Sequence, residues 1–151
     1  MCGANWKYGV SAEIFRDFAS GLRGDYRATL ERFVALEAFG SDHAKEEIRA
    51  LRDDLFARGE PSAHVLADGL DLLKTGDLRH ALPALHAPSL WIAGRRDRLV
   101  DARAMRDSAA LAAGPSEVHV IDHAGHAPFL THADEVASHL AAAFLQDSQR
   151  A

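Results

Sequence analysis

The hydrophobic positions in the first 80 residues recur at intervals of three and four, which is the spacing of one face of an α-helix. Four amphipathic helices are expected there, separated by short turns that contain glycine or proline. The expected helices are 11–21, 25–39, a third that begins after Ser41 or Asp42 and ends before Gly59, and a fourth that follows Pro61. Serine and aspartate both favour the N-cap, so either residue could start the third helix.

The pattern changes near residue 80. Residues 88–94 are a short apolar run bounded by proline and glycine, and residues 117–121 alternate and are rich in β-branched side chains. Both runs predict strands. An alanine-rich helix is expected over 101–113, and a last helix is expected after residues 131–134, which resemble a capping box. The order strand–helix–strand–helix predicts two parallel strands joined by a right-handed crossover.

The predicted fold class is therefore α/β, with a helical domain over 1–80 and part of a parallel sheet within 81–151. Parallel strands are usually buried on both faces, and a sheet of only two strands is marginally stable. We therefore expect the second half to be the last part of a larger sheet. Its open edge, residues 90–93, is expected to favour self-association.

The composition narrows the class of protein. The 151 residues are 48% hydrophobic and 26% charged, which excludes wholesale disorder. The net charge of −5 disfavours a nucleic-acid partner. The single cysteine, Cys2, excludes an internal disulfide and is expected to be inert. No apolar run approaches the roughly 20 residues that span a bilayer, and the N-terminus lacks a signal-peptide core, so a cytoplasmic protein without a membrane partner is expected.

Chemistry is expected in the loops that follow the two strands, because ligands of open α/β sheets bind beyond the carboxyl ends of the strands. Asp97 follows the first strand and His126 follows the second. With one crossover helix between them, both should lie at the same edge of the sheet. An aspartate that accepts a hydrogen bond from an imidazole fixes its tautomer and stabilises the imidazolium, so the histidine can act as a general base.

Several stretches resemble a known family. Residues 94–100, G-x-x-D-x-L-V, and the pair Gly125-His126 resemble the acid and histidine loops of α/β hydrolases. Residues 25–36 (DYRATLERFVAL), 69–79 (GLDLLKTGDLR) and 125–129 (GHAPF) resemble the pimeloyl-[acyl-carrier protein] methyl ester esterases of biotin synthesis. The resemblance implies a helical cap over 1–80, the C-terminal part of the hydrolase core over 81–151, and Asp97 and His126 as two members of a catalytic triad. It implies no organic cofactor and no metal.

The third member of the triad is not found in these residues. No serine stands in a G-x-S-x-G elbow, and Ser116, the nearest, precedes a strand and lacks the second glycine. We therefore expect a nucleophile-bearing part to be missing and the chain alone to be inactive. The alternatives are a non-catalytic remnant that binds a carrier protein, a fragment of another α/β-hydrolase esterase, and a fragment that does not fold alone.

The resemblance also assigns residues of the helical half. Basic side chains that would bind an acidic acyl carrier protein are Arg27, Arg32, Lys45 and Arg49. Arg27 is included because the family's further arginine falls at Ala28 here. Phe33 matches an aromatic residue that lines the acyl channel. The alternatives are a solvated surface balanced by neighbouring glutamates for the basic residues, and helix packing for Phe33.

Two further alternatives concern the second half. His119, His123, His126 and His132 are close in sequence, but their spacing matches no metal-binding motif, so no metal site is predicted. Asp97 stands among three arginines, so it could instead form an ordinary surface ion pair.

Overall fold

A computed structural model describes residues 6–37 and 44–148 of the chain. The helices of its first half are α1 (Ala12–Gly24), α2 (Tyr26–Glu37), α3 (Ala44–Ala57) and α4 (Ala63–Thr75). The second half contains the 3-10 helix η1 (Arg79–Ala84), the strands β1 (Ser89–Gly94) and β2 (Ser116–Ile121), and the helices α5 (Ala102–Ala109), α6 (Pro128–Thr131) and α7 (Ala133–Ser148).

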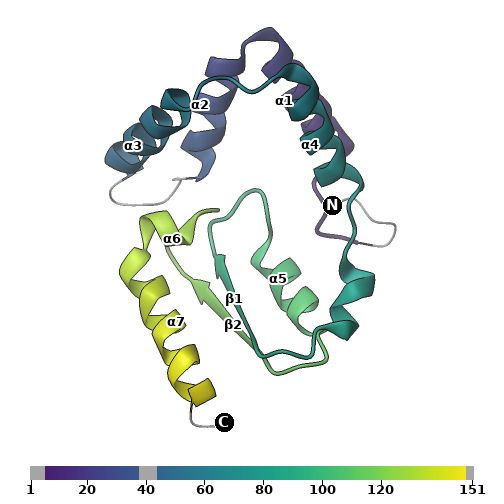
Figure 1. Cartoon of the computed structure of the whole chain (residues 1–151), viewed down its shortest axis with the longest axis vertical. Helices are drawn as coiled ribbons and strands as arrows, with labels where there is room; N and C mark the ends of the chain where they lie inside the picture. The colour runs from purple at the N-terminus through teal and green to yellow at the C-terminus, as the bar shows by residue number, and fades with distance from the viewer. Residues whose placement is uncertain (1–5, 38–43, 149–151) are drawn as a thin grey trace.

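Polar side chains cap the first two helices at their starts. The hydroxyl of Ser11 accepts a hydrogen bond from the backbone N–H of Ile14 at the start of α1. The carboxylate of Asp25 accepts one from Ala28 at 3.0 Å at the start of α2. α1 contacts both α2 and α4, and α2 contacts α3. The four helices form an arch over the rest of the chain (Figure 1).

The two strands of the second half are parallel, as predicted. Their register runs from Ser89 opposite Ser116 to Gly94 opposite Ile121. α5 contacts both strands and α7 contacts β1, and the two helices lie on opposite sides of the sheet (Figure 1). Ile121, Ala124 and Val136 form the buried core against which Ile92 packs. The strands therefore end together, and the loops that follow them start from the same edge.

Several boundaries differ from the predictions. α5 ends four residues before the predicted end, because the chain must turn to bring Gly114 against the backbone of His86. The predicted capping box is wrong: Thr131 belongs to α6, and its hydroxyl contacts His132 Nδ1 and the carbonyl of Ala127. η1 was not predicted. Ser41 and Asp42, the two predicted caps of the third helix, lie outside the described residues, as does Cys2.

Apolar surface stays exposed on both halves of the described chain. Leu72, Leu73 and Leu78 are each more than 60% exposed, and Phe129 is 62% exposed. Within the described residues the sheet has two strands, so each strand has one unpaired edge. None of the helices described is both long and apolar enough to cross a membrane.

This exposed surface leads to a prediction about the purified chain. We expect it to self-associate with increasing concentration, because unpaired strand edges and apolar patches are templates for association. Sedimentation velocity over a hundredfold range of concentration measures this. A monodisperse monomer that melts cooperatively would show that the two-stranded unit is sufficient alone.

Candidate active site

The candidate site is built on the loops that follow β1 and β2. Backbone hydrogen bonds join the loops: the N–H of Arg95 donates to the carbonyl of Ile121, and the N–H of Arg96 donates to the carbonyl of Ala124, each at 2.9 Å. These bonds continue the pairing of the strands beyond their ends. The two loops, residues 94–100 and 121–126, are therefore held together by backbone bonds and form one frame.

A glycine makes this close pairing possible. A Cβ atom at Gly94 would lie 2.0 Å from the carbonyl oxygen of Gly125 and 2.4 Å from that of Ala124. No side chain fits at those distances, and the carbonyl groups belong to buried backbone. The absence of a side chain at residue 94 is thus a geometric requirement of the frame.

The frame brings Asp97 and His126 together. Asp97 Oδ2 lies 3.0 Å from His126 Nδ1. Asp97 Oδ1 accepts hydrogen bonds from the backbone N–H groups of Leu99 and Val100 at 2.7 and 2.9 Å. The Asp97 side chain is only 6% exposed, whereas that of His126 is 32% exposed. The carboxylate is therefore held on both oxygens, and the imidazole reaches the surface of the site.

The surroundings of Asp97 favour its charged form. Burial acts to raise the pKa of this carboxyl, but the hydrogen bonds from His126 and from the backbone of Val100 and Leu99 outweigh it. The pKa of Asp97 is consequently below its ordinary value. Because an ionised carboxylate only accepts hydrogen bonds, His126 Nδ1 must carry the hydrogen, and in the neutral ring Nε2 then carries the lone pair. This is the tautomer that a general base requires.

Side-chain contacts also cross between the two loops. Arg95 forms an ion pair with Asp122, and an Nη atom of Arg96 lies 3.0 Å from His123 Nδ1. Arg95 holds the pKa of Asp122 below its usual range. The sequence left open that Asp97 forms an ordinary surface ion pair with one of its neighbouring arginines. In the structure, the Asp97 side chain is instead buried and bonded to His126.

The four clustered histidines are not brought together. His119 stacks on His139 at 3.9 Å between ring centres, His123 contacts Arg96, and His132 contacts Thr131. Among the residues that the structure describes, no group of three His, Cys, Asp or Glu side chains is placed to hold a metal ion.

The residues assigned to the helical half have different surroundings. The guanidinium of Arg27 lies over the ring of Phe56, 4.6 Å from its centre, and Arg32 donates a hydrogen bond to the hydroxyl of Thr29. Lys45 and Arg49 are exposed on α3. Phe33 is half-buried, with its ring centre 5.3 Å from that of Phe18. Their roles in recognition stay predictions.

Comparison with known proteins shows the family to which the chain belongs. The sequence pattern of the α/β hydrolase fold matches residues 8–133. The chain belongs to the α/β hydrolase family. It is 53% identical over 138 residues to the pimeloyl-[acyl-carrier protein] methyl ester esterase of Stenotrophomonas maltophilia, covering 91% of this chain and 53% of that protein. This α/β hydrolase chain thus spans about half the length of the curated relatives that it matches.

Solved structures show the same fold. An esterase from Exiguobacterium antarcticum superposes with a TM-score of 0.80 at 19% identity, over 93% of this chain and 50% of its own. A bromoperoxidase from Bacillus anthracis superposes with a TM-score of 0.78 at 24% identity, over 89% and 49%. These two proteins are named for different reactions, so the fold alone does not decide the chemistry of this α/β hydrolase chain.

The groups that hold Asp97 in place were not predicted from the sequence. Asp97 is held by the backbone N–H groups of Leu99 and Val100, and any residue except proline provides such a group. Residue type therefore does not reveal this role, although both residues belong to the motif at 94–100. The contact at Gly94 had a signal, since a glycine that ends a buried strand suggests a close approach of another backbone.

The frame leads to a prediction for Gly94→Ala. The new methyl group would collide with two carbonyl oxygens, so the loops must separate, at a cost of about 1–3 kcal/mol in stability. We expect the Asp97–His126 hydrogen bond to be lost, as observed by 15N NMR of the imidazole. Gly69→Ala in α4 is the matched control, because nothing lies within 4 Å of its added Cβ. An unchanged His126 signal in Gly94→Ala would contradict this role.

A second prediction concerns pH. Because the pKa of Asp97 is lower in the folded chain than its ordinary value of about 3.9, its charge stabilises the fold above that pH. This contribution is lost as the pH falls through the folded pKa. We expect 13C NMR to show the Asp97 carboxyl titrating below its ordinary range, and His126→Phe to raise that pKa because burial is then less opposed. An unaltered midpoint in His126→Phe would contradict the assignment.

Proposed function

We propose that this chain supplies the cap and the acid–histidine pair of a serine carboxylesterase that hydrolyses the methyl ester of pimeloyl-[acyl-carrier protein] in the cytoplasm, for biotin synthesis. The observation that carries the proposal is the buried Asp97 bonded to His126, in a chain 53% identical to an esterase of that name. Because the chain spans about half of that relative, the activity belongs to the complete enzyme.

The proposed reaction uses side chains alone. A serine hydroxyl attacks the ester carbonyl carbon while His126 Nε2 accepts its proton. The tetrahedral intermediate collapses, the C–O bond to the methoxy group breaks, and the His126 imidazolium donates the proton that makes methanol. Water then attacks the acyl-serine ester, with His126 again as base, and releases the free acid. Asp97 keeps the imidazole in the required tautomer and stabilises its charged form.

The serine must come from a part of the enzyme other than these 151 residues. No G-x-S-x-G elbow occurs in them. Ser116 stands at the start of β2, where its hydroxyl contacts that of Ser89, and His126 follows the opposite end of the same strand. A relative with a complete fold would place the nucleophile above the carboxyl ends of the strands, near His126.

We propose that the carrier protein binds to exposed basic residues of α3. Lys45 and Arg49 are four residues apart on this helix and are both exposed, so an acidic partner can reach them. Arg27 and Arg32 would contribute less, because Phe56 and Thr29 already engage their guanidinium groups. Phe33 packs against Phe18, which supports a role in joining α1 to α2 at least as much as contact with the acyl chain.

A chimaera tests the proposal. We expect the N-terminal half of the Stenotrophomonas maltophilia relative, fused ahead of this chain, to cleave both the carrier-bound methyl ester and a small soluble ester. His126→Ala should abolish both activities, and Asp97→Asn should reduce kcat by roughly 10³–10⁴-fold. The unfused chain should show no burst with an activated ester. Wild-type rates in a correctly folded His126→Ala chimaera would overturn the proposal.

The same chimaera separates recognition from chemistry. Lys45→Glu with Arg49→Glu should slow cleavage of the carrier-bound ester, more at low salt than at high salt, and leave the small ester unaffected. Arg16→Glu with Arg23→Glu on α1 is the control with the same change in net charge. An equal loss on both esters would mean that Lys45 and Arg49 stabilise the cap and do not recognise a carrier.

A further inference from the structure

Two connections join the helices α1–α4 to the rest of the chain. Residues 6–11 lead into α1, and residues 76–88 lead from α4 to β1. The two connections meet where the guanidinium of Arg79 lies over the ring of Trp6, 4.7 Å from its centre. A cation over the face of an indole is attracted by the ring quadrupole, and tryptophan is the strongest such partner.

Arg79 is held in the orientation that this contact needs. Its Nε and Nη2 atoms donate to the two carboxylate oxygens of Asp77 at 2.9 and 2.5 Å, and its backbone N–H donates to Oδ1 at 3.1 Å. The Arg79 side chain is 22% exposed. The hydrogen bonds from Arg79 hold the pKa of Asp77 far below its usual range, so the pair is charged at neutral pH. The bonds to Asp77 therefore fix the orientation of the Arg79 guanidinium group, and its planar face is free to lie over Trp6.

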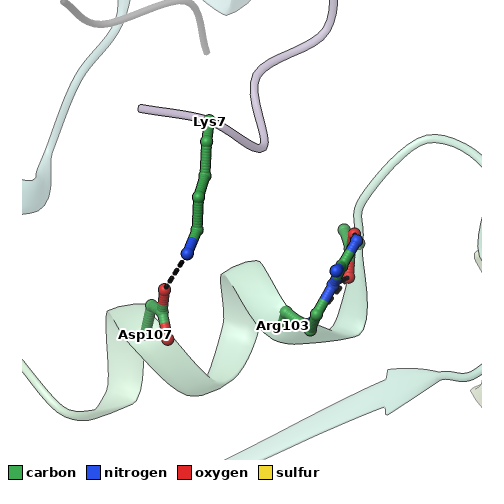
Figure 2. A network of polar contacts seen from close by, with 4 residues as sticks. Lys7, Arg103 and Asp107 are labelled. Carbon is green, nitrogen blue, oxygen red and sulfur yellow. Dashed lines mark hydrogen bonds and ion pairs between the residues drawn. The ribbon is translucent and has the colours of Figure 1, made fainter. Parts of the chain in front are cut away.

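The first connection is also tied to α5. Trp6 contacts Tyr8 edge to face, with ring centres 5.1 Å apart. Lys7 reaches Asp107 on α5, with Nζ 4.0 Å from Oδ2 (Figure 2). Arg103 of the same helix lies 5.7 Å from the centre of the Tyr8 ring. The exposed ion pair contributes little, so the aromatic contacts are the stronger connection.

The space beside the first connection is not filled by packed side chains. A cavity of about 620 Å3 separates the first connection from the loop that carries Asp97, with Tyr8 and Val10 on one side and Asp97 and Leu99 on the other. The arch also contacts the second half where α3 meets α6 (Figure 1). These are two places at which the arch is supported, and one of them depends on Trp6 and Arg79.

We propose that Arg79 is a positioning residue: by clasping Trp6 it locks the two connections together beside α5 and fixes where α1–α4 lie above the Asp97–His126 pair. Removing the clasp lets the arch move about its contact at α6. This inference concerns the arrangement of the chain and does not rest on the proposed esterase function.

Distance measurements on the full chain test the clasp. Spin labels go on Asp68→Cys in α4 and Ala137→Cys in α7, both exposed, in a Cys2→Ser background, with excess unlabelled chain to suppress intermolecular signal. We expect one narrow distance distribution in the parent. Arg79→Ala and Trp6→Ala should each broaden it and shift it to longer distances, and the double variant should do no more than either alone, because both remove the same contact.

Two controls keep the outcome specific. Arg58→Ala removes another ion-paired arginine, in the turn just after α3, and should leave the distribution narrow. Arg79→Lys keeps a cation beside Trp6 and should restore most of the narrow component. With Trp91→Phe leaving Trp6 as the single tryptophan, its emission should shift to the red in Arg79→Ala and not in Arg58→Ala.

Two results would overturn the proposal. One is a narrow, unshifted distribution in a folded Arg79→Ala chain. The other is loss of helical circular dichroism in both Arg79→Ala and Arg79→Lys, because that would mean that Arg79 stabilises the helices themselves and does not position them.

Discussion

The close approach of Gly94 to the carbonyl groups of Ala124 and Gly125 is the constraint on which the site depends. It allows the backbones of the two loops to bond to each other directly beyond the ends of the strands. Once the loops are joined, Asp97 follows three positions after Gly94, and the backbone N–H groups of Leu99 and Val100 hold its carboxylate toward His126. A backbone requirement at one residue thereby helps to place a hydrogen bond between residues far apart in sequence.

The sequence predicted this part well because its signals are local. Each strand is a short apolar run, and loops after successive parallel strands must meet at one edge, so the pairing of Asp97 with His126 followed from order alone. The failure at Thr131 has the opposite cause. A threonine three residues before an aspartate fits a capping box, but the chain already turns into α6 at Pro128, and the hydroxyl bonds within that turn. Short helices of this kind depend on what packs around them, which a local pattern does not contain.

The contacts that attach the helical half could not be predicted for a related reason. Trp6 and Arg79 lie at opposite ends of that half, and neither stands in a periodic pattern. Only the fold shows that the two connections run side by side. The hydrogen bonds that place Asp97 beside His126, in contrast, join residues between Gly94 and His126. The chain therefore contains a frame for the Asp97–His126 pair, whereas the position of α1–α4 depends on contacts between distant segments.

The arginines of this chain show why charge alone is a poor guide to recognition. Arg27 and Arg79 both lie over aromatic rings, Arg32 bonds to a buried threonine, and Arg95 joins the two site loops. Each could be counted as part of a basic surface, yet each has a partner within the chain that fixes its side chain. Guanidinium groups suit this use because their planar faces stack on aromatic rings while the N–H groups at their edges donate hydrogen bonds. Lys45 and Arg49 are exposed on α3, and an acidic partner would meet them with less competition from the chain itself.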